Sequence, residues 1–211
     1  MMATLDTNKP VALVTGASGG VGQALVQRLV DRGYAVIGSV LNEGELEQAT
    51  AQGMSDATFF VADFSTADIG LVQLKAALAE NGGGLHAAIS CAGTNPLGPI
   101  ETTPIDTLRR AIEINAIGNV ALYQAAIPYL RNSAGRFIFV SSTAGKVAMP
   151  LLGYYTASKH ALEGLVDTMR LEAGQWNIPV SLVQPGAIAT KMARSFGHQL
   201  DAQLSQLDDT G

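Results

Sequence analysis

The sequence has 211 residues and a formal net charge of −5, with 47% hydrophobic and 15% charged residues. A chain of this length can bury a core without disulfides or metals, and at about 150 residues per domain it predicts one domain, residues 1–211. The hydrophobic content excludes intrinsic disorder, and the lack of a lysine and arginine cluster argues against a nucleic-acid partner.

Short apolar runs alternate along the chain with longer helical patterns. The predicted strands are Val11–Val14, Tyr34–Val40, Ala57–Ala62, Leu85–Cys91, Arg136–Ser141 and Pro179–Gln184. The predicted helices are Gly19–Arg32, Glu43–Gln52, Thr66–Asn81, a long helix from Pro104 towards Arg131, and Gly153–Ala173. The strands are apolar throughout, which is typical of strands covered on both faces. This alternation predicts an α/β fold with a doubly wound, Rossmann-type parallel sheet and helices on both faces.

The turn after the first strand, Thr15–Gly22, is rich in glycine. Glycines there let the backbone approach a pyrophosphate, and the following helix presents free N–H groups and partial positive charge. A glycine cluster can also be a tight turn that binds nothing, but its place between strand and helix favours a dinucleotide site. No Lys-Ser or Lys-Thr pair follows, so it is not a triphosphate P-loop. The candidate binding residues are Gly16, Ser18, Gly20, Val21 and Gly22.

A second pattern lies in the segment Tyr155–Lys159, which puts a phenol and an ammonium four residues apart on one helix face. A nearby lysine favours the phenolate and lowers the tyrosine pKa, so the tyrosine can exchange a proton with a carbonyl or alcohol oxygen. An ordinary surface pair is the alternative. Ser142, at the end of the fifth predicted strand, can hydrogen-bond a substrate oxygen. Asn115 lies inside the long helix, where asparagine has poor propensity.

Together these positions resemble the short-chain dehydrogenase/reductase family, in its short reductase branch, over about Val11 to Met192. Gly16, Gly20 and Gly22 carry the T-G-x-x-x-G-x-G pattern, and Asn115, Ser142, Tyr155 and Lys159 form an Asn-Ser-Tyr-Lys tetrad. The alternative T-G-x-x-G-x-x-G reading, through Gly19, is typical of longer sugar-nucleotide epimerases. This chain has no room for their C-terminal substrate domain.

The resemblance implies catalytic roles for the tetrad in hydride transfer between a nicotinamide and a hydroxyl or carbonyl carbon. Tyr155 would be the general acid/base, and Lys159 would lower its pKa and bind the nicotinamide ribose. Ser142 would hold the substrate oxygen, and Asn115 would position a water that links Lys159 to solvent. Further implied cofactor contacts are Asp63 and Phe64 at the adenine, Ala92 and Gly93 at the ribose, and Pro185, Gly186, Ile188 and Thr190 over the nicotinamide.

The end of the second strand usually separates NAD from NADP, because an acid there binds the ribose 2′-hydroxyl and an arginine accepts a 2′-phosphate. The expected position is Val40, with Ser39, Leu41 and Asn42 beside it, so neither acid nor arginine is present. No acid repels a phosphate, and Ser39 can donate to one. The cofactor is therefore NADP or NAD, with a slight preference for NADP.

The family's usual features are incomplete at two places. Cys91 replaces an asparagine before Ala92, and we interpret it as a packing residue rather than a metal or redox group. Relatives continue with a further helix and a seventh strand that we do not find here, so 193–211 is expected to be a partial substrate lid or tail. The missing part would remove one of the family's two usual dimer surfaces. The other surface is built from the long helix around Asn115 and the Tyr155 helix, which predicts a homo-oligomer.

The substrate is expected to be a small molecule, an apolar carbonyl or alcohol, because the expected walls are apolar: Thr94–Leu97, Ala148–Leu152 and the segment after Thr190, with Met192 and Phe196. A non-catalytic nucleotide sensor or an inactive relative is the alternative. The N-terminus lacks an apolar signal region, no apolar run reaches the roughly 18 residues of a membrane helix, and a single cysteine fits a reducing compartment. These features predict a soluble cytoplasmic protein with no membrane, nucleic-acid or metal partner.

Overall fold

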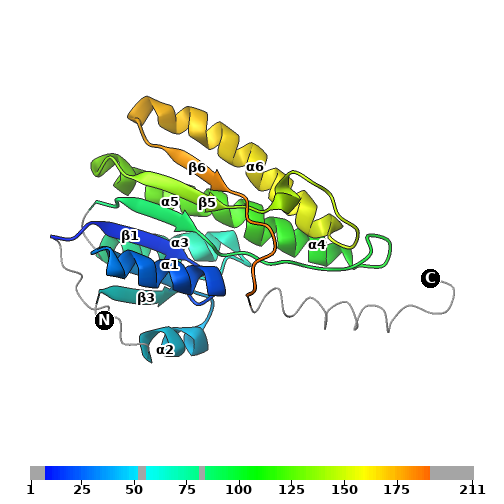
Figure 1. The fold of residues 1–211 in the computed structure, drawn as a ribbon, viewed down its shortest axis with the longest axis horizontal. Helices are drawn as coiled ribbons and strands as arrows, with labels where there is room; N and C mark the ends of the chain where they lie inside the picture. Colours follow the sequence, from blue (N-terminus) through cyan, green and yellow to red (C-terminus); the bar gives the residue numbers. More distant parts are fainter. Residues whose placement is uncertain (1–7, 52–55, 81–83, 191–211) are drawn as a thin grey trace.

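The computed structural model describes residues 8–51, 56–80 and 84–190. Its strands are β1 (Val11–Thr15), β2 (Ala35–Val40), β3 (Ala57–Val61), β4 (Ala87–Ser90), β5 (Arg136–Val140) and β6 (Val180–Val183). They form one sheet in the order β3-β2-β1-β4-β5-β6, and every neighbouring pair is parallel (Figure 1). The order reverses between β1 and β4, as in a doubly wound dinucleotide-binding sheet, so the predicted fold class is confirmed.

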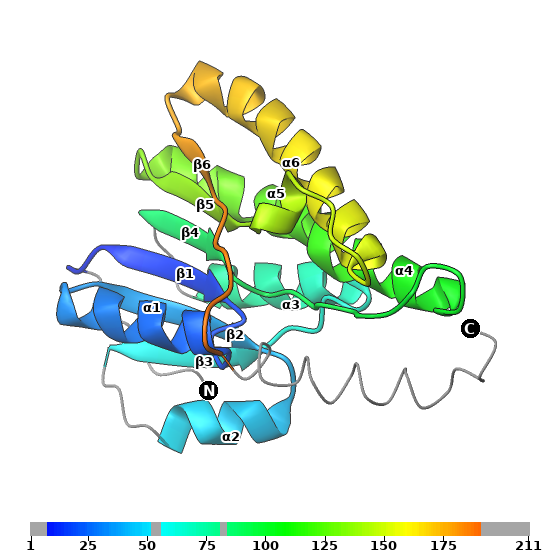
Figure 2. The same cartoon turned by 45° about the vertical axis from the view of Figure 1, so that its right-hand side comes forward.

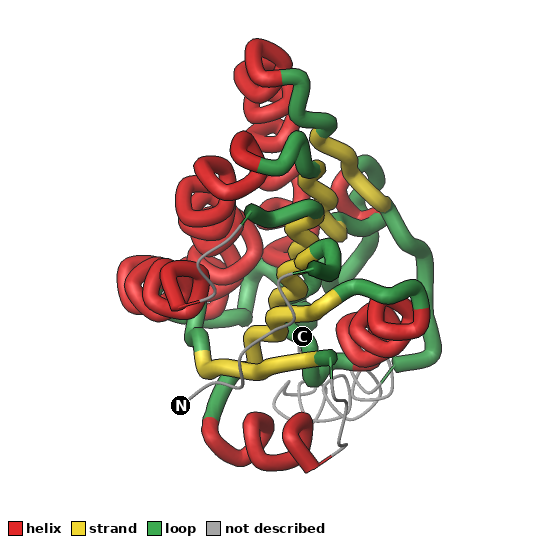
Figure 3. The backbone as a smooth tube through the Cα atoms, turned by 90° about the vertical axis from the view of Figure 1, so that its left-hand side faces the viewer, coloured by secondary structure: helices red, strands yellow, loops and turns green. Residues whose placement is uncertain are grey.

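Helices cover both faces of this sheet. They are α1 (Gly20–Asp31), α2 (Glu43–Ala51), α3 (Ala67–Glu80), α4 (Ile105–Ile112), α5 (Gly118–Asn132) and α6 (Gly153–Ala173), with short turns η1 (Glu113–Ile117), η2 (Thr143–Gly145) and η3 (Gly174–Trp176). Figure 3 shows α3, α5 and α6 on one face, α1 on the other, and α2 along the β3 edge. This arrangement leaves the carboxyl ends of the strands open for a ligand.

Each face has its own apolar core. On the α3–α5–α6 side, Leu13, Leu122 and Leu162 pack around the rings of Phe137 and Phe139, whose centroids lie 4.3 Å apart. On the α1 side, the core is built from valines and Ile89 of β1, β2, β4 and α1. Burial of each large apolar side chain contributes about 1.5–3 kcal/mol, so both layers hold the sheet rigidly beneath the site.

The strands β5 and β6 differ from the expectation that every strand is covered on both faces. Ser181 and Val183 of β6 are exposed, and Ile138 and Val140 of β5 are only partly buried. The reason is that α1 packs against β1 and β2, and no helix among the described residues covers this side of β6. Residues 193–211, the predicted lid or tail, lie outside the described residues.

The predicted single helix from Pro104 to Arg131 is also interrupted. It consists of α4, one π-helical turn (η1), and α5. Within this turn the carbonyl of Asn115 accepts a hydrogen bond from Nδ2 of Asn119 at 2.9 Å, so a side chain supplies a donor inside the helix. Isolated π-helical turns are frequent at functional sites, and this one carries Asn115.

Candidate active site

The four predicted catalytic side chains come from three elements that meet at the carboxyl ends of β4 and β5. Tyr155 and Lys159 lie one turn apart on α6, and Nζ of Lys159 is 5.8 Å from the centroid of the Tyr155 ring. That Nζ donates to the carbonyl of Val140 at 3.1 Å, which ties α6 to the end of β5. Ser142 follows β5, caps η2 by accepting from the Ala144 N–H at 3.1 Å, and lies near enough to Tyr155 to affect the pKa of its phenol.

Asn115 links this group to the loop after β4. It is fully buried, and its side chain accepts from the Thr94 N–H at 2.9 Å and donates to the Thr94 carbonyl at 2.8 Å. Its Nδ2 also donates to Oγ of Ser158 at 2.8 Å. A Cβ on Gly93 would lie 3.1 Å from Oδ1 of Asn115 and 3.8 Å from Nζ of Lys159, so both side chains close around this glycine. Asn115 therefore holds the predicted ribose loop against α6.

Burial dominates the proton chemistry of the site. It raises the pKa of Tyr155 above its ordinary value, and the nearby Ser142 hydroxyl opposes this only in part. It also lowers the pKa of Lys159 from 10.5 to about 8, against the opposing effects of Cys91 and Glu163. The pKa of Tyr155 thus moves opposite to the expected depression by lysine, because the phenol loses hydration and the lysine is itself less readily charged.

Replacing Lys159 with methionine should change how stability depends on pH. Because the pKa of Lys159 falls from 10.5 to about 8, the unfolded chain binds more protons between these pH values, and this group's contribution to stability rises with pH. Below pH 8 the folded protein carries the whole penalty, about 3 kcal/mol. The variant should therefore be at least as stable as the native protein at pH 7, with an advantage that shrinks towards pH 10.5.

Denaturant unfolding of both proteins across this pH range measures the difference. Lys75→Met, at an exposed position of α3, is the matched control and should follow the native pH dependence. Parallel curves for the native protein and the Lys159 variant would contradict the penalty.

The glycine turn fits a pyrophosphate. Gly16 has a φ of +64°, and a Cβ there would lie 2.8 Å from the Ala92 nitrogen. A Cβ on Gly22 would lie 2.1 Å from the Gly16 carbonyl oxygen, so the first turn of α1 packs directly on the turn before it. Gly19, at the N-cap of α1, provides no side-chain cap, which leaves the helix N-terminus open to an anion.

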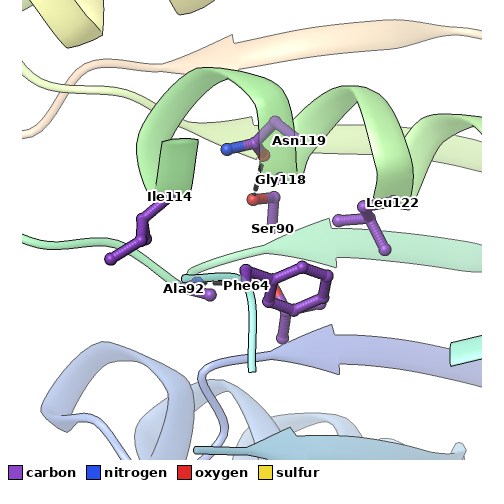
Figure 4. Close-up of a pocket in the computed structure, with 8 residues that line it drawn as sticks. Phe64, Ser90, Ala92, Ile114, Gly118, Asn119 and Leu122 are labelled. Carbon is purple, nitrogen blue, oxygen red and sulfur yellow. Dashed lines mark hydrogen bonds between the residues drawn. The ribbon is translucent and has the colours of Figure 1, made fainter. Parts of the chain in front are cut away.

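Phe64 and Ala92, two further predicted cofactor residues, lie beside this turn. They line a small pocket between the ends of β1 and β4 and helix α5 (Figure 4). The pocket is lined by Thr15, Phe64, Ser90, Ala92, Ile114, Gly118, Asn119 and Leu122, and Ser90 donates a hydrogen bond to Asn119. Oγ1 of Thr15 accepts from the N–H of Ala92 at 3.3 Å, so β1 holds the end of β4 in place. Phe64 and Ala92 are therefore neighbours of the glycine turn.

The other predicted cofactor residues differ in whether a cofactor could reach them. The segment from Pro185 and Gly186 through Ile188 to Thr190 leaves β6 and crosses the strand ends towards α1, as Figure 2 shows. Cγ2 of Thr190 lies 3.0 Å from where a Cβ on Gly20 would stand, so the segment reaches the glycine turn. Ser39, in contrast, is 1% exposed inside β2, and its hydroxyl has no open path to a phosphate. Asp63 accepts from the Ser65 N–H at 2.8 Å after β3.

Sequence reasoning missed Glu163, which lies one turn after Lys159 on α6. It is 4% exposed, and its Oε2 accepts from Nε2 of Gln184 at 2.7 Å and from Nζ of Lys146 at 3.0 Å. Burial acts to raise its pKa, but its hydrogen bonds and the Lys146 charge outweigh burial and hold the pKa below the ordinary value. One carboxylate thus joins α6 to the residues that follow Ser142 and precede Pro185.

Burial raises the pKa of the Cys91 thiol to about 12 against the Lys159 charge, which fits a packing residue more than a reactive thiolate. Within residues 8–51, 56–80 and 84–190, no three His, Cys, Asp or Glu side chains gather where they could hold a metal ion. That the protein uses no metal stays a prediction.

The sheet order, the glycine turn and the tetrad define an α/β oxidoreductase that binds a nicotinamide dinucleotide. The family model for short chain dehydrogenases matches residues 10–201. The chain is 30% identical to the NADPH-dependent 3-dehydrocapnine reductase of Ornithobacterium rhinotracheale, over 95% of this chain and 78% of that protein. It is 32% identical to the trans-4-hydroxycyclohexanecarboxylate dehydrogenase of Sinomonas cyclohexanicum, over 94% and 83% of the two chains.

A solved variant of the actinorhodin polyketide ketoreductase with NADPH shares the fold, with a TM-score of 0.85 at 23% identity over 98% of this chain and 81% of that one. The chain therefore belongs to the short-chain dehydrogenase/reductase family, whose enzymes act on CH–OH and C=O groups. None of the described helices combines the length and the apolar character needed to cross a bilayer.

Proposed function

We propose that this protein interconverts a hydroxyl and a carbonyl group by hydride transfer, with Tyr155 as the general acid/base. The observation that carries the proposal is the convergence of Ser142, Tyr155 and Lys159 at the same sheet edge as the glycine turn. The nicotinamide cofactor supplies or accepts the hydride, and the protein supplies alignment and the proton.

Each side chain then has a distinct task. Ser142 and Tyr155, whose side chains lie close together, hold the substrate oxygen between them. Because burial raises the pKa of Tyr155, its phenol is protonated at neutral pH and is ready to donate in the carbonyl-reducing direction. The Lys159 ammonium lies close enough to stabilise the phenolate that remains. Asn115 positions the Thr94 loop and, in this proposal, a water beside Lys159.

The substrate class rests on the apolar residues that the sequence places at the expected walls of the site. Leu97 is 4% exposed and Leu152 is 8% exposed, and Met149 is 43% exposed at the surface beside them. Apolar walls around a single polar reaction centre favour a small or medium-sized apolar ketone or secondary alcohol. The residues expected to complete the wall, Met192 and Phe196, lie outside the described part of the chain.

The direct test is turnover. Purified protein is mixed with NADH or NADPH and a panel of apolar ketones, and with the oxidised cofactors and the matching alcohols, while nicotinamide absorbance and product are followed. We expect turnover with at least one apolar pair. Tight nucleotide binding with no turnover of any substrate would instead support a non-catalytic nucleotide sensor.

We also propose a cytoplasmic homodimer joined through α5 and α6. Ile117, the last residue of η1 before α5, is 45% exposed, and Leu165 of α6 is 37% exposed, so the turn that leads into α5 and helix α6 each present an apolar side chain to solvent. Light scattering on the purified protein tests the mass, and charged substitutions at both positions should shift it to that of a monomer.

A further inference from the structure

A carboxylate lies at the junction of the two loops that form the nucleotide end of the site. Glu45 is in the first turn of α2, and its Oε2 accepts a hydrogen bond from Oγ of Ser18 in the glycine turn at 2.6 Å. The same oxygen accepts from the Leu41 N–H, just after β2, at 2.9 Å. Glu45 therefore bridges the loop after β1 and the loop after β2.

Hydrogen bonds of the surrounding backbone fix the position of this carboxylate. The Glu45 N–H donates to Oδ1 of Asn42 at 3.0 Å, which fixes the start of α2. The Ala17 N–H donates to the Ser39 carbonyl at 2.8 Å, which holds the glycine turn against β2. Both hydrogen bonds to the Glu45 side chain converge on Oε2, so Oε1 has no hydrogen bond within the described part of the chain. Oε1 can therefore accept one from a ligand.

Within residues 8–51, 56–80 and 84–190, no cation is paired with Glu45. Between Gly16 and Ala51 the only basic residues are Arg28 and Arg32, which lie at the C-terminal end of α1. That end is roughly 18 Å from the glycine turn, because a helix rises about 1.5 Å per residue. No described lysine or arginine forms a salt bridge with Glu45. Among the described residues, the Glu45 carboxylate is therefore a negative charge that no salt bridge neutralises.

We propose that Glu45 makes this enzyme select NAD(H) over NADP(H), by accepting a hydrogen bond from the adenosine ribose hydroxyl and repelling a 2′-phosphate. An acid about 20 residues beyond the glycine turn performs this task in dinucleotide-binding folds, and Glu45 lies 23 residues after Gly22. The slight preference for NADP rested on the missing acid at Val40. Glu45 supplies that acid from α2 instead of from the strand, and the selection rests on the cofactor site of the proposed function.

A purely structural role for Glu45 gives a different expectation. A clamp between Ser18 and Leu41 needs only an acceptor oxygen, and glutamine keeps one. Discrimination against a phosphate needs the negative charge, which glutamine lacks. Glu45→Gln therefore separates the two roles, because the clamp survives and the repulsion does not.

Equilibrium binding of NADH and NADPH, followed by nicotinamide fluorescence, tests the proposal without turnover. The native protein should bind NADH at least about tenfold more tightly than NADPH, and Glu45→Gln should tighten NADPH binding by about tenfold with a smaller change for NADH. Glu47→Gln is the matched control, because Glu47 is exposed on the same helix and its loss changes the net charge equally. This control should leave the ratio of the two dissociation constants unchanged.

Glu45→Lys extends the test in the opposite direction. Its ammonium should reverse the preference, so that NADPH binds more tightly than NADH. Tighter NADPH binding by the native protein, or an unchanged ratio in Glu45→Gln, would overturn the selection by Glu45. Failure of both nucleotides to bind would overturn the proposed function as well, whereas the expected ratio without any turnover would overturn the proposed reaction alone.

Discussion

Replacing Tyr155 with phenylalanine is expected to lower kcat by about a hundredfold to ten-thousandfold, the usual contribution of a positioned acid/base group. The phenyl ring keeps the packing of Tyr155 and its place beside Lys159, and only the hydroxyl near Ser142 is lost. Nucleotide dissociation constants should stay within about twofold, because the glycine turn is untouched.

The adjacent tyrosine provides a matched control. Tyr154 donates its hydroxyl to the Thr103 carbonyl at 2.9 Å, so Tyr154→Phe removes the same atom one residue earlier. This variant should lose about 1 kcal/mol of unfolding free energy and keep kcat within about twofold. Steady-state rates with the substrate pair from the turnover screen, and fluorescence titration of the nucleotide, give both quantities. Equal kcat values for native protein and Tyr155→Phe would exclude Tyr155 as the acid/base.

Features that depend on local spacing could be predicted from the sequence. Tyr155 and Lys159 are four residues apart, so any helix that contains both must place them on one face. The glycine turn lies between an apolar run and a helical pattern, which predicts its place at a strand end. That the strands run parallel could be predicted because apolar strands alternate with helices along the chain. Only a short list of topologies satisfies that pattern.

Features that depend on contacts between distant segments could not be predicted. Glu45 and Ser18 are 27 residues apart, and their contact depends on how the loops after β1 and β2 approach each other. The sequence directed the search for an acid to Val40, which is 1% exposed inside β2. Glu163 shares the helical face of Lys159, but its partners Lys146 and Gln184 come from other elements.

The predicted lowering of the Tyr155 pKa differs from the raised pKa in the structure for a related physical reason. The sequence shows which charge lies near a phenol, but it does not show how much water the phenol loses on folding. Burial is the largest influence on both Tyr155 and Lys159, and it disfavours the charged form of each. The π-helical turn at Asn115 was missed because the residues around it follow an ordinary helical pattern.

Replacing Gly22 with alanine is expected to destabilise the protein by about 3 kcal/mol or more and to abolish nucleotide binding. The added Cβ would lie 2.1 Å from the Gly16 carbonyl oxygen and 2.9 Å from Cα of Ala17. Both are backbone atoms of the glycine turn, so relief requires the turn and α1 to separate. The same movement displaces the helix N-terminus from the position in which it can bind a pyrophosphate.

Gly164→Ala gives the opposite expectation within the same fold. Gly164 is an exposed position of α6, and a Cβ there meets nothing within 4 Å. Alanine in a helix interior is favoured over glycine by about 0.5–1 kcal/mol, so this variant should be more stable and should bind nucleotide normally. Denaturant unfolding and fluorescence titration of both variants compare the two sites directly. A Gly22 variant that unfolds with the native free energy would show that α1 does not pack on the turn as described. Glycine would then not be needed for a close contact between Gly22 and the backbone of the turn.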